Sequence, residues 1–200
     1  MTQRVYLESG HQRVFAVSLD WPGWARSGRH ADEALERLLD YAPRYGAVVG
    51  QDLGEEDVTV VGTVPGNSYT DFGAPRVTGP WDDVPSSAAQ REEHLGVLRR
   101  CWSYFDAVVL AAPLTLLTGP RGGGRDRDRI ADHVREAERH FAPQIGGRVA
   151  PRTDWSAQRE SLVTSLREHD GLQRWPVDYA LRIIAWHVLD HAWEIEDRRP

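Results

Sequence analysis

The sequence predicts an α+β protein in which a small β-β-α-β domain, residues 1–64, precedes a bundle of four helices, residues 86–200. Short runs of β-branched and aromatic residues occur in the first third of the chain, and long stretches with apolar residues at helical spacing occur after residue 85. Residues 65–85 are rich in Gly, Pro, Asn, Asp and Thr and show no periodicity. They are therefore expected to form a connector between the two domains.

The first domain is expected to begin with a β-hairpin. Arg4–Leu7 and Arg13–Leu19 carry β-branched and aromatic residues in partial alternation, and Ser9-Gly10 between them favours a turn. A helix is predicted further along, because apolar residues recur at helical spacing until Pro43, which is expected to end it. This helix and two later strands are predicted over residues 30–41, 47–49 and 58–64.

The second domain is predicted from four amphipathic segments. In each, apolar residues form a stripe at helical spacing, and Pro or Gly follows the first three segments. Asp154 is suited to cap the third segment, and Pro176 suits the first turn of the fourth. The four helices are predicted over residues 86–112, 126–141, 154–168 and 176–197. Helices of this length joined by modest loops favour a bundle whose core lies between the stripes.

Composition excludes several kinds of chemistry. All 24 basic residues are arginine, so Schiff-base catalysis and the phosphate-binding lysine of a P-loop are excluded. Cys101 is the single cysteine, which rules out an intrachain disulfide and every zinc site built on paired thiolates. Any metal must therefore be held by imidazole or carboxylate groups. Cys101 itself has apolar neighbours, which favours a buried, inert thiol over a nucleophile.

Charge and hydropathy indicate the expected environment. The net charge of −6 argues against a general nucleic-acid binder, which needs a basic surface to neutralise phosphates. The first residues, MTQRVYLESGHQ, lack the apolar core of a signal peptide. No uncharged apolar run approaches the roughly 20 residues that span a bilayer. We therefore expect a cytoplasmic protein that does not associate with a membrane.

The fourth predicted helix carries a candidate metal-binding pair. His187 and His191 are four residues apart and lie at the centre of its apolar stripe, so both rings can reach one ion. The competing interpretation is a pair of core histidines, each hydrogen-bonded to a neighbour. A catalytic zinc site usually takes a third protein ligand. His133 and His140 share one flank of the second helix and His94 lies in the first helix, so the spacing alone does not choose among them.

Two segments together carry a family resemblance. Gly122–Phe141 and Arg182–Asp197 resemble the DinB/YfiT-like superfamily, and the resemblance covers about residues 86–197. It implies a four-helix bundle with an up-down-down-up connection and a metal site formed by His133, His187 and His191. By ligand type the divalent metal is zinc or nickel. Such proteins act on small molecules, either as metal-dependent hydrolases or as S-transferases that activate a low-molecular-weight thiol.

The first domain has a resemblance of its own. Phe15–Leu35, in which a strand and a Pro-Gly turn lead into a helix, is similar to the HicB-like pattern of antitoxins. This favours an alternative function, a non-catalytic binding or assembly protein in which the histidines are core residues and the first domain mediates association, for instance as a homodimer. A regulatory nucleic-acid module is a third reading, although no DNA-binding motif accompanies the HicB-like segment.

Two charged segments near the predicted helix ends complete the candidates. Arg121 and Arg125 flank a run of three glycines before the second helix, where guanidinium and backbone amides suit an acidic substrate or a thiol cofactor. A flexible loop is the alternative for this run. The charged residues from Glu194 to Arg199 are expected to form a solvated helix end.

Overall fold

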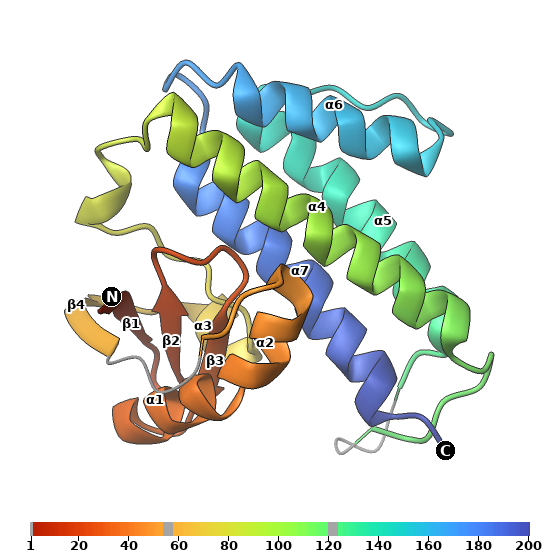
Figure 1. Ribbon diagram of the computed structural model, residues 1–200, viewed down its shortest axis with the longest axis horizontal. Helices are drawn as coiled ribbons and strands as arrows, with labels where there is room; N and C mark the ends of the chain where they lie inside the picture. Colours follow the sequence, from red (N-terminus) through yellow and green to blue (C-terminus); the bar gives the residue numbers. More distant parts are fainter. Residues whose placement is uncertain (1, 54–57, 120–123) are drawn as a thin grey trace. The chain divides into compact units, whose positions relative to one another are not determined.

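The computed structural model describes residues 2–53, 58–119 and 124–200 of the chain. It contains both helices and a four-stranded sheet, which confirms the α+β class (Figure 1). The contacts divide the chain into two compact units, Met1–Val84 and Pro85–Pro200. Each unit is described by itself below.

The first unit is built on a mixed sheet. Its strands are β1 (Gln3–Ser9), β2 (Val14–Ser18), β3 (Ala25–Gly28) and β4 (Val58–Pro65), in the order β3-β2-β1-β4. β2 pairs antiparallel with β1 and with β3, whereas β4 runs parallel to β1. The predicted hairpin is confirmed, and its turn is closed by the amide of Gly10, which donates to the carbonyl of Arg13 at 2.8 Å.

The helical part of the first unit differs from the prediction in one element. The predicted helix is present as α1 (Ala31–Asp40), but residues 47–49, predicted as a strand, end a second helix, α2 (Ala42–Val49). Pro43 lies in the first turn of α2, where a missing amide hydrogen costs nothing. Tyr45 anchors the helix, because its ring stacks on Trp24 and its hydroxyl donates to the carbonyl of Pro22 at 2.8 Å.

The predicted connector, residues 65–85, is instead structured, and residues 65–84 belong to the first unit. Two short helices lie within it, α3 (Ser68–Phe72) and η1 (Pro80–Asp82). The segment is fastened to β1 by the buried carboxylate of Glu8. That carboxylate accepts hydrogen bonds from the Thr70 hydroxyl at 2.6 Å and from the amides of Arg76 and Val77 at 2.9 and 3.0 Å.

The second unit confirms the four predicted helices. They are α4 (Ala88–Ala111), α5 (Arg127–Phe141), α6 (Trp155–Arg167) and α7 (Val177–Asp197), with a short η2 (Ala142–Ile145) after α5. Each begins within two residues of its predicted start, because local signals fix it. The Ser87 hydroxyl accepts from the amide of Gln90, and the carboxylate of Asp154 accepts from the amide of Ser156 at 2.8 Å.

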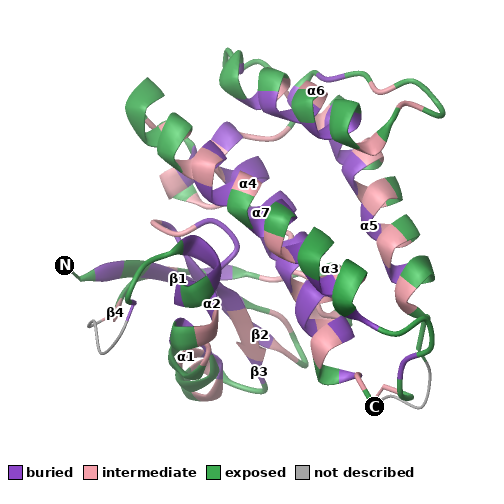
Figure 2. Ribbon diagram, turned by 45° about the vertical axis from the view of Figure 1, so that its right-hand side comes forward, coloured by how far each residue is buried: buried purple, intermediate pink, exposed green. Residues whose placement is uncertain are grey.

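Helix α7 is the most enclosed element of the second unit. It contacts α4, α5 and α6, and Figure 2 shows it buried along most of its length. Figures 1 and 2 both show α4 packed alongside it. The core side chains of this unit include Leu95, Leu98, Phe105, Ile130, Val134, Leu162, Leu166, Leu181 and Ile184. Although α7 has 21 residues, none of the described helices is long and apolar enough to cross a membrane.

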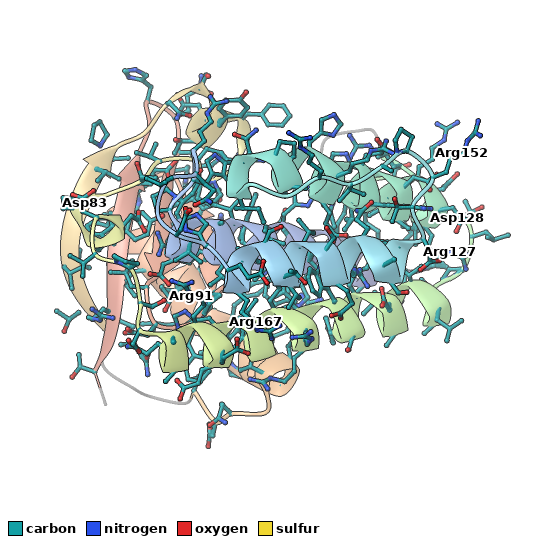
Figure 3. The ribbon with its side chains drawn as sticks, turned by 90° about the horizontal axis from the view of Figure 1, so that it is seen from above. Asp83, Arg91, Arg127, Asp128, Arg152 and Arg167 are labelled. Carbon is teal, nitrogen blue, oxygen red and sulfur yellow. The ribbon has the colours of Figure 1, made fainter. Side chains whose placement is uncertain are left out.

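Arginine side chains fasten the helix ends of the second unit. Figure 3 shows Arg91 and Arg167 near one another at one end of α4 and α6, with Arg127 and Asp128 at the other end. The guanidinium of Arg91 donates to the carbonyls of Arg167 and His169 at 3.0 and 3.1 Å, so it satisfies acceptors that the end of α6 leaves open. These contacts hold the helices that surround α7.

Candidate metal centre

Three histidines from α5 and α7 meet inside the second unit. His187 and His191 are one turn apart on α7, and His133 on α5 faces both of them. His140, which the sequence left as an equal candidate, is exposed, and its Nδ1 lies 2.7 Å from the carbonyl oxygen of Glu136. His94 is elsewhere on α4, with Nδ1 3.8 Å from a carboxylate oxygen of Asp178. The structure therefore selects His133 as the third member.

The spacing of these rings suits a single ion. One ligand atom from each histidine can be chosen so that all three lie within 4.8 Å of one another. Nε2 of His187 lies 3.3 Å from Nε2 of His133. In tetrahedral zinc sites each imidazole nitrogen lies about 2.0–2.1 Å from the ion, so two such nitrogens are about 3.3 Å apart. The three histidines are thus close enough to hold a metal ion, and their donor set fits one.

A carboxylate fixes the orientation of one ring. Oε2 of Glu194 lies 2.8 Å from Nδ1 of His191. A carboxylate can only accept, so Nδ1 of His191 carries the hydrogen and Nε2 presents its lone pair. Outer carboxylates of this kind orient metal-ligating histidines and make them more basic. A core histidine could make the same contact, so the hydrogen bond fits both interpretations of the cluster.

The electrostatic environment keeps His133 neutral. Burial, together with the charges of His191 and Arg125, lowers the pKa of His133 to about 4, and Glu194 only partly opposes this. A metal ligand must present a lone pair, and a ring with this pKa needs no deprotonation near neutral pH. His133 is therefore ready to bind an ion without releasing a proton.

The sequence predicted a solvated helix end from Glu194 to Arg199, but two of these side chains form buried or half-buried contacts. The Arg198 side chain is 7% exposed, and its Nη1 donates to Oε1 of Glu194 at 2.8 Å. Burial raises the pKa of Glu194, but hydrogen bonds and charges from His191 and Arg198 outweigh that effect and lower it. Glu194 is thus held ionised between His191 and Arg198, and the sequence had given neither Glu194 nor Arg198 a role at the histidine cluster. The available signal was their spacing of three and seven residues from His191.

Of the two arginines predicted to bind an anion, the structure describes Arg125 and does not describe Arg121. Arg121 lies outside the described residues, so its role stays a prediction. Arg125 is exposed, and its charge adds to the larger effects of burial and of His191 in lowering the pKa of His133. Its backbone carbonyl accepts a hydrogen bond from Arg198 at 3.0 Å. Arg125 therefore adds positive charge beside the three imidazoles.

Aromatic rings pack beside His187. The Phe141 ring lies 5.6 Å from that of His187 in an edge arrangement, and Trp175 packs against Phe141 at 5.3 Å. Phe141 is buried, and so is Tyr179, whose ring contacts Trp175. These rings give His187 an apolar neighbourhood, in which electrostatic interactions are stronger than in water.

The cysteine of the chain takes no part in the cluster. Cys101 is fully buried on α4, and burial raises the pKa of its thiol to about 12. A thiol with that pKa is almost entirely protonated at neutral pH and is a poor nucleophile. The expectation of an inert thiol is confirmed.

Comparison with models of protein families, with curated proteins and with solved structures found no match to this chain. The chemistry of the site therefore rests on its own residues. Three imidazoles whose ligand atoms lie within 4.8 Å of one another, with the Glu194 carboxylate bonded to one of them, can hold a divalent cation and would leave its charge largely uncompensated.

Proposed function

We propose that the protein is a metalloprotein in which His133, His187 and His191 hold one divalent ion, zinc or nickel. The single observation that carries this proposal is the cluster itself, with two Nε2 atoms 3.3 Å apart and the third ring turned by Glu194. Imidazole suits both metals, and three protein ligands leave a coordination position open. The resemblance of residues 86–197 to the DinB/YfiT-like superfamily supports the same ligand set.

We further propose that the centre acts on a small molecule, as a thiol S-transferase or as a hydrolase. A divalent ion bound there would acidify a water or thiol at the open position. In thiol transfer, the sulfur of a low-molecular-weight thiol bonds to an electrophilic carbon, and the thiol proton passes to the displaced group. In hydrolysis, the oxygen of water bonds to that carbon, and a proton of the water passes to the displaced group. The buried Cys101 cannot supply the thiol, so it must come from a small molecule.

The residues of the chain define what such a site does to its ligand. The rings of Phe141 and Trp175 give an apolar neighbourhood beside His187, and the positive charge of Arg125 acts on His133. A carboxylate or thiolate group on the substrate or thiol would therefore be oriented toward Arg125. We assign no general base, because no described side chain at the site is placed for one.

Metal content of the purified protein tests the proposal. Protein prepared without a nickel column should contain about one equivalent of zinc or nickel by mass spectrometry, and His187→Ala should lose most of it. His140→Ala is the matched control, since His140 is an exposed histidine on the same helix as His133. A metal-free wild type, or equal occupancy in His187→Ala, would favour the alternative of a non-catalytic assembly protein with a HicB-like module.

Activity is tested separately from metal content. A screen of several low-molecular-weight thiols against small electrophiles, run beside a panel of small hydrolysable esters and amides, should give turnover with wild type that is lost in His187→Ala. Removal of the metal by a chelator and its return should abolish and restore that turnover. A metal-loaded protein without turnover in either panel would leave the centre as a binding site alone.

A further inference from the structure

Four charged or imidazole side chains form one continuous row on α7. His187, His191, Glu194 and Arg198 recur at intervals of three and four residues, which places them on a single face of the helix. His191 bonds to Glu194, and Glu194 bonds to Arg198. The row thus begins at the metal site and ends at the buried C-cap of the helix.

Arg198 joins this row to two other parts of the second unit. Its Nε donates to the carbonyl of Leu117 at 2.7 Å, and its Nη1 donates to the carbonyl of Arg125 at 3.0 Å as well as to Glu194. The amide of Leu117 donates back to the carbonyl of Arg198 at 2.8 Å. The backbone of Gly124 also lies close to the Arg198 guanidinium, because a Cβ at Gly124 would overlap Nη2 of Arg198. Only the planar fork of arginine offers donors in all these directions.

We propose that Glu194 and Arg198 are positioning residues of the metal centre, an inference that rests on the metal site proposed above. Glu194 keeps the hydrogen of His191 on Nδ1 and the lone pair of Nε2 directed at the ion. Arg198 acts through Glu194 on that ring, and its bonds to Leu117 and Arg125 fix the segment that carries Arg125 against the same end of α7. A metal ligand and a charged neighbour of the site are therefore held by one guanidinium.

The first test measures zinc affinity by competition with a chromophoric chelator. Glu194→Ala should bind zinc roughly 10- to 100-fold more weakly, as is typical when an outer carboxylate is removed. Glu194→Gln should lose less, since an amide oxygen still accepts from Nδ1 of His191. Arg198→Lys should also weaken binding, and combining it with Glu194→Ala should add little, because both changes act on the same ring.

Two readouts do not require metal. In the metal-free wild type, long-range proton–nitrogen NMR should find the hydrogen of His191 on Nδ1, and Glu194→Ala should shift it toward Nε2, where a solvated imidazole prefers it. Amide exchange at Leu117 should speed up about tenfold in Arg198→Lys, which loses a hydrogen bond to that residue, and stay unchanged in Glu194→Ala.

Matched controls separate positioning from general stability. Glu196→Gln removes a carboxylate from the same helix, and Glu196 accepts a hydrogen bond from the Tyr104 hydroxyl on α4 at 2.7 Å. Arg199→Lys is the corresponding control for Arg198→Lys, because it makes the same substitution at the next residue. Unchanged zinc affinity and an unchanged tautomer in Glu194→Ala would overturn the proposal. If the wild type binds neither zinc nor nickel, the proposed function fails, and the tautomer and exchange measurements still decide whether the row positions His191.

Discussion

Individual charged side chains at the start of α7 are held by several contacts at once. Asp178 accepts a hydrogen bond from the amide of Ser86 at 2.7 Å and lies 3.8 Å from Nδ1 of His94. Burial raises the pKa of Asp178, but these groups outweigh it and lower the pKa to about 2. The first turn of a helix also favours negative charge. Asp178 thus links the residues before α4 to the beginning of α7, and His94 has a structural role here.

The first prediction concerns the pH dependence that follows from Asp178. Because its folded pKa is depressed from 3.8 to about 2, its contribution to stability is present above about pH 4 and is lost as the pH falls toward 2. Asp178→Asn should lower the free energy of unfolding by about 2 kcal/mol at pH 6, and this difference should vanish near pH 2. Urea midpoints at several pH values measure it.

The control for Asp178 is Glu93→Gln, which removes one negative charge from an exposed position on α4. It should change the unfolding free energy by less than about 0.5 kcal/mol at every pH. An Asp178→Asn deficit that persists below pH 2.5 would mean that the side chain acts by shape and hydrogen bonding, with no contribution from its charge.

At the residue scale, sequence spacing identified two histidines of the candidate metal centre but could not identify the third. His187 and His191 are four residues apart on one helix, a local relation that the sequence states directly. His133 and His140 are two turns apart on the same flank of α5, so only the position of α5 against α7 separates them. Arg198 looked solvated because its acceptors, the carbonyls of Leu117 and Arg125, are distant in sequence.

At the scale of helices, a buried polar network joins three elements. Glu138 on α5 is fully buried, and its carboxylate accepts from Nε1 of Trp155 on α6 at 2.6 Å. Arg159 lies 3.5 Å from the same carboxylate, stacks over the Trp155 ring and donates to Asp106 on α4 at 2.7 Å. Burial raises the pKa of Glu138, and Arg159 and Trp155 partly oppose this. The network specifies how α4, α5 and α6 meet.

Removing Glu138 should therefore weaken the bundle. Glu138→Ala takes one of two carboxylates away from the guanidinium of Arg159 and opens a cavity, so the free energy of unfolding should fall by about 3 kcal/mol. Glu138→Gln should cost less, because the amide still accepts from Trp155. Chemical denaturation measures both variants. Glu136→Gln on the same helix, which breaks an exposed pair with Arg139, should cost less than about 1 kcal/mol, and an equal loss in all three variants would refute the network's importance.

Sequence patterns found long elements better than short ones. The four bundle helices each contain several turns of periodic apolar residues and local caps, so their ends were predicted closely. α2 was missed because Pro43 ends one helix and begins the next, and its three last residues resemble a strand when taken alone. α3 has five residues, too few for any period, and its position depends on the distant Glu8.

At the scale of the whole molecule, the chain divides into units with separate cores. Large buried side chains such as Tyr6, Trp24 and Tyr45 belong to the first unit, whereas Phe105 and Leu181 belong to the second. All residues proposed for the metal centre and its positioning row lie in the second unit. A unit with its own core and its own hydrogen-bonded site has the requirements for independent folding.

We therefore predict that residues 85–200 alone fold and bind zinc. Circular dichroism should show a helical protein with a cooperative thermal transition, and its zinc affinity should match that of the full chain within about threefold, since all three proposed ligands lie in this fragment. The same fragment carrying His187→Ala should fold equally well and lose the metal. A fragment that folds but binds zinc at least tenfold more weakly would show that the first unit contributes to the metal centre, and an unfolded fragment would show that the two cores depend on one another.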